Sequence, residues 1–205
     1  LDGKTQTIKD ITENKNDISK LIINSKKPMI IFGESFIKLE SAKCLFNSFK
    51  EFLYNNNKIT DDWNPVNLLS VDAATVGSFD LDVIDQTNKL LDDLNENKFE
   101  IVYLLGQDNL NFKKKNEFII YQGSHGDKGA EIADIIIPGS AYTEQSGHYT
   151  NLEGKIQKAF KASYPPGDAK EDWQIINDLA ELMNNRKLFN DKDELESSMF
   201  NYLNL

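Results

Sequence analysis

The chain has 205 residues, of which 40% are hydrophobic and 27% are charged, a composition typical of a soluble globular protein. Its formal net charge of −10 argues against nucleic acid or an anionic membrane surface as the partner, because both are bound through cationic patches. No apolar run approaches the about 20 residues that cross a bilayer, so we expect no direct membrane span.

The N-terminal third predicts two helices around a first strand. Asp17 is expected to cap a short helix whose apolar face holds Ile18, Leu21 and Ile22. The apolar run from Met29 to Phe32 predicts a buried strand that ends at Gly33. Side chains at helical spacing predict a helix over 39–54, with an apolar stripe formed by Leu39, Ala42, Leu45, Phe46, Phe49 and Phe52. Such an aromatic stripe is typical of a core.

Cys44 is the single cysteine and lies on this predicted helix. One cysteine excludes an internal disulfide and any multi-cysteine zinc or iron–sulfur site within this chain. Between Ala42 and Leu45, a buried thiol is a better interpretation than a nucleophile.

The middle of the chain predicts two strands separated by one helix. Trp63 is expected to pack back onto the domain, and 66–70 to form a short strand. We expect 73–79 to be a connection and 81–94 a helix that turns Ile84, Leu91 and Leu94 inward. Residues 101–105, with the sequence IVYLL, predict a second buried strand.

Residues 118–139 predict a strand, a short helix and a strand of a parallel sheet. Apolar runs at 118–121 and 135–137 flank the glycine-rich turn GSHG, after which Asp127 can cap a helix reaching Ala133. The polar segment after Gly139 follows the carboxyl end of a strand, where open α/β sheets bind their ligands.

The C-terminal part predicts one long helix and a charged end. Asp168 with Glu171 resembles a capping box, and Trp173, Ile176, Leu179 and Met183 are expected to form the buried face of the helix. Residues 185–205 are expected to be a peripheral tail with at most one short helix. Strands alternating with helices predict one α/β domain over 1–205, with a mainly parallel, Rossmann-like sheet and flanking helices.

The residues that could carry chemistry form weak patterns. His125 and His148 are the only imidazoles, and Ser124 and Ser146 lie close to them in sequence, but GSHG lacks the strand–elbow–helix context of a hydrolase nucleophile. A metal site would need both histidines with Glu144 or Asp127. No G-x-G-x-x-G or Walker sequence follows a strand, so an ordinary nucleotide fingerprint is absent. Hydrogen-bonded turn residues are the preferred interpretation of both histidines.

A resemblance adds more than these patterns. The stretch FIIYQGSHGDKGAEIADIIIPGSAYTEQSGHYTNLEGKIQ at 118–157, followed by YPPGDAKEDWQII, closely resembles the C-terminal half of the largest iron–sulfur subunit of respiratory complex I, the NADH:ubiquinone oxidoreductase. KKPMIIFG and IVYLLGQD lie in the matching order, so the resemblance extends over about 26–183. That half is itself similar to molybdopterin oxidoreductases, and the fold implied is molybdopterin oxidoreductase-like.

The resemblance implies a structural, non-catalytic domain in the peripheral arm, on the matrix side of the mitochondrial inner membrane. Iron–sulfur clusters and FMN are expected in neighbouring parts of the complex, with no cofactor in this chain. Its expected partners are other peripheral-arm subunits, including the iron–sulfur N-terminal half of the same subunit, and no nucleic acid. Because the sequence begins at Leu1 without those cofactor domains, we expect a processed chain or a piece of a longer subunit. The alternatives are a fragment of a molybdopterin-binding oxidoreductase and an unrelated Rossmann-like domain that binds a small molecule.

The resemblance also implies which residues line the former cofactor loops. The vestigial candidates are Gly123, His125, Asp127, Asn151, Glu153 and Gly154, and no catalytic or metal-binding residue is expected. Asn151, Glu153, Gly154 and Gln157 match the family pattern N-x-E-G-x-x-Q. Lys155 stands where arginine is common, which weakens a planar, bidentate contact with an anion. We therefore expect Asn151 and Glu153 to satisfy backbone groups, and Gly154 to adopt a conformation that side chains disfavour.

Overall fold

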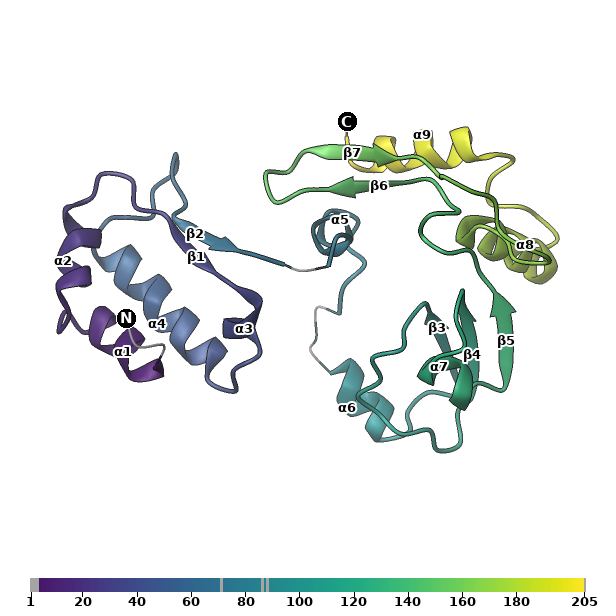
Figure 1. Cartoon of the computed structure of the whole chain (residues 1–205), viewed down its shortest axis with the longest axis horizontal. Helices are drawn as coiled ribbons and strands as arrows, with labels where there is room; N and C mark the ends of the chain where they lie inside the picture. Colours follow the sequence, from purple (N-terminus) through teal and green to yellow (C-terminus); the bar gives the residue numbers. More distant parts are fainter. Residues whose placement is uncertain (1–3, 71, 86, 88, 205) are drawn as a thin grey trace. The chain divides into compact units, whose positions relative to one another are not determined.

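The computed structural model describes the chain except for residues 1–3, 71, 86, 88 and 205. The chain divides into two compact units, Leu1–Ala73 and Ala74–Leu205 (Figure 1). Each unit contains parallel strands flanked by helices, which confirms the predicted α/β fold class. The predicted single domain over 1–205, with 185–205 as a peripheral tail, stays a prediction.

The first unit packs helices against a pair of parallel strands, β1 and β2. Its elements are α1 (Thr5–Thr12), α2 (Asp17–Asn24), β1 (Ile30–Phe32), α3 (Glu34–Ile37), α4 (Ala42–Asn55) and β2 (Val66–Leu68). Aromatic rings fill the core: the Phe32 ring centroid lies 4.5 Å from that of Phe36, 5.4 Å from Phe46 and 5.7 Å from Phe49. Phe52 and Leu53 of α4 are buried beside them. The aromatic stripe is therefore core, as its spacing predicts.

Several details of the first unit differ from the sequence predictions. The strand predicted as buried over 29–32 is only partly so, because Met29 and Ile31 are exposed. Asn16, rather than Asp17, caps α2, because its side chain accepts a hydrogen bond of 3.0 Å from the Ile18 N–H. Leu21 is exposed, so the apolar face of α2 is narrower than predicted. Cys44 is also exposed, so the predicted buried thiol is wrong. Trp63 is anchored as predicted, since its indole N–H donates to the Pro28 carbonyl at 3.0 Å.

The second unit contains a parallel sheet of three strands, ordered β3-β4-β5, and a separate antiparallel hairpin, β6-β7. Its elements are α5 (Thr75–Asp80), α6 (Leu90–Asn95), β3 (Ile101–Leu105), β4 (Phe118–Gly123), α7 (Lys128–Ile132), β5 (Ile135–Pro138), β6 (Gly147–Thr150), β7 (Ile156–Ala159), α8 (Asp172–Asn184) and α9 (Lys192–Tyr202). Within the described residues, no helix is long and apolar enough to cross a membrane.

The predicted strand–helix–strand unit is confirmed as β4, α7 and β5, with β4 and β5 parallel. Ile119 and Tyr121 of β4 form the small core under α7 together with Leu104 of β3. Asp134 joins the two strands, because its carboxylate accepts a 2.8 Å hydrogen bond from the Ile119 N–H. This bond, followed by contact with Lys114, lowers the pKa of Asp134.

The helix predicted over 81–94 is wrong in most of its described length. A short helix, α5, covers most of the predicted connection 73–79 and ends one residue beyond it, and α6 covers only the end of the predicted helix range. Asp85 explains the difference: its carboxylate accepts hydrogen bonds from the backbone N–H groups of Thr87 and Leu90, which fixes a turn in place of helix. Residues 86 and 88 of the predicted helix lie outside the described residues.

The C-terminal region is more ordered than the sequence predicts. The polar segment after Gly139 contains the hairpin β6-β7, and α8 begins at a capping box formed by Glu171 and Gln174 instead of Asp168 and Glu171. The buried residues of α8 are Ile175 and Asn177, whereas the predicted core residues Ile176 and Met183 are exposed. Asn177 is buried because its amide binds backbone groups of Leu188 and Phe189. The buried face of α8 therefore differs from the face that the apolar spacing predicts, because it includes the polar residue Asn177.

Candidate functional site

The turn after β4, where the resemblance places the former cofactor loop, is filled by a side chain of the same strand. The Tyr121 ring is 1% exposed and lies against Gly123 and Gly129. A Cβ added at Gly129 would stand 2.5 Å from this ring, and one at Gly123 would overlap the tyrosine hydroxyl. Both glycines are therefore required by the tyrosine beneath them.

Asp108, after β3, fixes Tyr121 in this position. The tyrosine hydroxyl lies 2.9 Å from Asp108 Oδ2 and 3.2 Å from the His125 carbonyl oxygen. The other carboxylate oxygen of Asp108 accepts the Gly129 N–H at 2.9 Å. Burial, together with the bond to Asp108, raises the pKa of Tyr121 to about 12. The phenol therefore remains a hydrogen-bond donor at neutral pH.

The other candidates in this turn are His125 and Asp127. His125 is exposed, and its Nδ1 lies 2.9 Å from the Ser124 hydroxyl. Among the described residues no carboxylate is hydrogen-bonded to this imidazole, so the orienting group of a catalytic triad is absent there. Asp127 occupies the N-cap position of α7, as predicted, but its side chain makes no capping hydrogen bond.

The loop between β6 and β7 is closed by Asn151. The Asn151 side-chain oxygen accepts 2.9 Å hydrogen bonds from the N–H groups of Glu153 and Lys155. Gly154 has a φ of +77°, which confirms the predicted left-handed conformation. The prediction for Asn151 is also confirmed. The Glu153 side chain is exposed and makes no hydrogen bond to a backbone group in the described part of the chain. The prediction that it satisfies backbone groups is therefore wrong.

The two candidate loops are not joined by any hydrogen bond or ion pair among the described residues. A different site, which sequence patterns missed, gathers polar groups at the start of α8. Asp172 accepts hydrogen bonds from Gln122 of β4 at 2.7 Å and from Gln145 at 3.0 Å. Tyr103 of β3 donates in turn to the buried Gln122 side chain. This network attaches α8 to the carboxyl end of the parallel sheet.

Glu171 forms the second half of this junction. It is 7% exposed and binds two lysines, Lys192 at 2.6 Å and Lys161 at 2.9 Å, while the Trp173 indole N–H donates to it at 3.2 Å. Burial by itself would raise the pKa of Glu171, but the hydrogen bonds from Lys192 and Lys161 outweigh that effect and lower the pKa. In the sequence, Glu171 lies 10 residues from Lys161 and 21 from Lys192, and isolated charged residues of this kind are common on surfaces.

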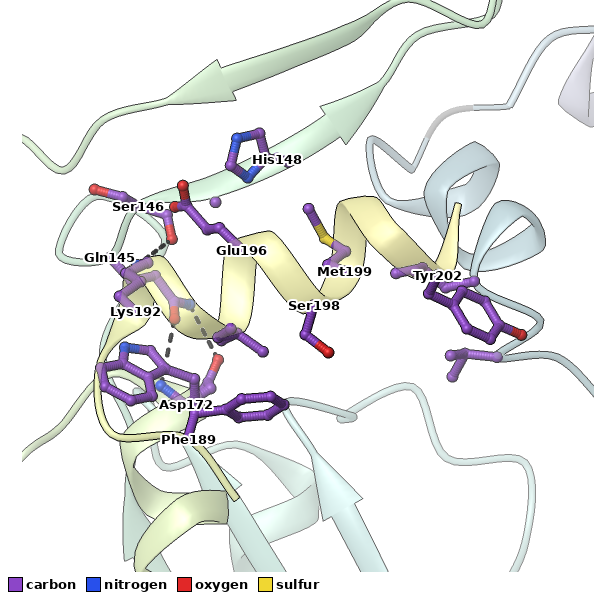
Figure 2. A pocket seen from close by; sticks show the side chains of 15 residues that line it. Gln145, Ser146, His148, Asp172, Phe189, Lys192, Glu196, Ser198, Met199 and Tyr202 are labelled. Atoms are coloured by element: carbon purple, nitrogen blue, oxygen red, sulfur yellow. Dashed lines mark hydrogen bonds between the residues drawn. The ribbon is translucent and has the colours of Figure 1, made fainter. Parts of the chain in front are cut away.

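Beside the junction lies a groove of about 570 Å³ between β6, the start of α8 and α9 (Figure 2). Figure 2 shows Gln145 bound to Asp172 at one end, with Met199 and Tyr202 of α9 further along. The lining is mainly apolar and comprises Leu81, Val83, Gln145, Ser146, Gly147, His148, Asp172, Trp173, Phe189, Lys192, Leu195, Glu196, Ser198, Met199 and Tyr202. In the described residues, no group of three His, Cys, Asp or Glu side chains could hold a metal ion.

Comparisons with known proteins identify the family. Residues 1–182 match the molybdopterin oxidoreductase family. The 75 kDa subunit of NADH-ubiquinone oxidoreductase from Reclinomonas americana is 36% identical over 200 residues, which cover 96% of this chain and 29% of that protein. The mitochondrial 78 kDa subunit from Candida albicans is 39% identical over 86% of this chain and 24% of its own length. An NADH-quinone oxidoreductase subunit from Rickettsia felis is 40% identical over 88% of this chain and 26% of its own length.

The chain thus spans about a quarter of the length of the curated relatives it matches. The family match covers the first unit and the second unit as far as residue 182, including the strand–helix turn and the β6-β7 hairpin described above, and it ends before α9. This chain belongs to the molybdopterin oxidoreductase family, and the relatives it matches are subunits of NADH-ubiquinone and NADH-quinone oxidoreductases.

Proposed function

We propose that this chain is a structural, non-catalytic domain of respiratory complex I, within the peripheral arm on the matrix side of the mitochondrial inner membrane. One observation carries the proposal: the chain's own side chains close both loops in which the family resemblance places a cofactor. Tyr121 and Asp108 close the first loop, and Asn151 closes the second. A domain whose ligand loops are closed internally is suited to scaffolding.

The residues present do not fit a molybdopterin, whose phosphate needs donors and positive charge at the strand–helix turn. The space over Gly123 and Gly129 is taken by the Tyr121 ring. The charged residues closest in sequence to the turn are mainly acidic: Asp127 and Glu131 are negative, and Lys128 is positive. Asp108 is also negative, and it already accepts two hydrogen bonds. The alternative function, as a fragment of a molybdopterin-binding oxidoreductase, is therefore disfavoured, and no chemical step is assigned to that cofactor.

The cysteine content supports the same proposal. An iron–sulfur cluster is usually held by four cysteine thiolates, and this chain has Cys44 alone. We propose that the clusters and FMN belong to neighbouring parts of the complex. The partners would then be other peripheral-arm subunits and the iron–sulfur half of the same subunit, in keeping with relatives several times longer than this chain.

A pair of substitutions in the purified complex tests the proposal. His125→Ala alters the exposed side chain of the former cofactor loop and should leave NADH oxidation per assembled complex unchanged. Glu171→Gln alters the buried junction and should lower the amount of assembled complex without changing turnover per complex. A large loss of turnover in His125→Ala, with normal assembly, would contradict the scaffold proposal.

A further inference from the structure

The last helix of the second unit, α9, is attached differently from the other elements. None of its 11 residues is fully buried. It nevertheless runs along the β6-β7 hairpin (Figure 1), where the His148 and Phe200 rings meet edge to face with centroids 5.2 Å apart. Hydrophobic burial alone is therefore a weak source of attachment for this helix.

Charged contacts supply the attachment, and they lie in the first two turns of α9. The Lys192 ammonium binds Glu171 at 2.6 Å and the Ser146 carbonyl at 2.7 Å, which ties α9 to α8 and to the residue preceding β6. Glu196, one turn later, pairs with Lys158 of β7 at 2.7 Å. The second half of α9 contributes Met199 and Tyr202 to the mainly apolar groove (Figure 2).

The segment that leads into α9 is held independently. Asn177 of α8 is buried, and its side chain binds the backbone of Leu188 and Phe189 with three hydrogen bonds of 2.8 to 3.0 Å. Asn190 lies two residues before α9 and is bound to that helix, because its N–H and its side-chain amide both donate to Glu194. The contacts made by Asn177 therefore end at Phe189, and the contacts made with α9 itself begin at Asn190.

We propose that α9 is a conformational strap that opens as one unit about the junction between Phe189 and Asn190. Lys192 and Glu196 form its clasp, and opening uncovers the apolar side chains of the groove, among them Trp173 and Phe189. The clasp contacts Glu171, Ser146 and Lys158, and these three residues lie outside β3, β4 and β5, so the strap detaches without disturbing that sheet. Local openings of this kind cost less free energy than global unfolding.

Hydrogen–deuterium exchange of the complex that contains this chain tests the strap. Lys192→Met removes the ammonium and keeps the length of the side chain. It should speed exchange of the α9 amides by about tenfold or more, since Glu171 loses one of its two partners. The β4 amides and those of Leu188 and Phe189 should be unchanged. Lys192→Arg retains both contacts and should restore slow exchange.

Lys187→Met is the matched control, because Lys187 forms an exposed ion pair with Glu181 at 3.7 Å on the neighbouring segment. It should change exchange of α9 by less than about twofold. Unchanged exchange of α9 in Lys192→Met would overturn the ionic clasp. Equal acceleration in α9 and β4 would overturn the strap, because it would show that the whole unit opens together.

Discussion

The two units are stabilised in different ways. The core of the first unit is aromatic and aliphatic, built from Phe32, Phe49, Phe52 and Leu53, with Ser19 as its buried polar residue. In the second unit the apolar core is small, and the buried residues that the structure describes there include six polar or charged ones: Glu117, Gln122, Ser140, Thr150, Glu171 and Asn177. The first unit thus depends on exclusion of water. The second depends more on buried hydrogen bonds, although the Ser140 hydroxyl is buried without a hydrogen-bond partner among the described residues.

This difference has a structural consequence. Apolar contacts are non-directional, so they stabilise a unit without fixing one arrangement. Buried hydrogen bonds are directional and costly when broken, so Gln122, Glu171 and Asn177 fix how the sheet, α8 and the residues before α9 meet. For a scaffold, the second unit is the better candidate for a precisely shaped surface.

The largest effect is expected in the aromatic core. Phe52→Ala should destabilise the first unit by about 3–5 kcal/mol, because it leaves a cavity under a buried ring. Tyr54→Ala, on the exposed side of the same helix, is the matched control and should change stability by less than about 0.5 kcal/mol. Hydrogen–deuterium exchange of the α4 amides measures the stability of both variants. Similar losses of stability in the two would contradict the aromatic-core assignment.

The second largest effect is expected at the charged junction. Glu171→Gln should destabilise the second unit by about 3 kcal/mol, because it leaves Lys161 and Lys192 without their carboxylate. Denaturant unfolding followed by exchange of the α8 amides measures this loss. The exposed pair Lys170–Asp178 supplies the control: Asp178→Asn should cost less than about 1 kcal/mol. Equal losses of stability in Glu171→Gln and Asp178→Asn would mean that burial of Glu171 adds nothing to the stability of the unit.

The same carboxylate gives a pH dependence of known sign. The pKa of Glu171 is lower in the folded chain than its usual value. Its stabilisation is therefore complete above the usual pKa of a glutamate and is lost as pH falls through the lowered pKa. Stability of α8 should decrease on acidification below about pH 4.3, and this decrease should be smaller in Glu171→Gln. An identical acid profile in both proteins would refute the contribution of Glu171.

A smaller effect is expected at the β6-β7 loop. Gly154→Val should cost about 1–3 kcal/mol through backbone strain at positive φ. Gly126→Ala is the control, since an added Cβ there meets no atom within 4 Å and the residue has no positive φ. Thermal unfolding compares the two, and equal stability would show that the loop relaxes around the valine.

The smallest expected effect is at the closed turn. Tyr121→Phe retains the ring under Gly123 and removes the hydroxyl, leaving one oxygen of Asp108 without its donor. The expected cost is about 1–2 kcal/mol, in the range for a lost hydrogen bond to a charged group. Exchange of the Gly129 amide, which Asp108 also binds, reports the change. No change would mean that ring packing alone closes the turn.

Sequence patterns predicted the strands more accurately than they predicted the polar contacts. The continuous apolar runs at 101–105 and 135–137 correctly predicted the strands β3 and β5. The burial expected of such runs is incomplete, because Ile101 and Leu105 at the ends of β3, and Ile136 of β5, are exposed. Helix boundaries failed where a side chain bound nearby backbone, as Asp85 does, or where a buried residue was polar, as Asn177 is. The left-handed conformation of Gly154 was predicted from the family resemblance, and it suits a glycine because a side chain disfavours positive φ. The Glu171 junction was not, since its partners are distant in sequence.

Native purification through a tag on this chain, with metal analysis and identification of the co-purifying proteins, tests the central claim most directly. The scaffold account predicts recovery in an iron-rich, molybdenum-free membrane complex that oxidises NADH. A small soluble species that carries stoichiometric molybdenum would contradict it, because the loops closed by Tyr121 and Asn151 would then have to open around a cofactor.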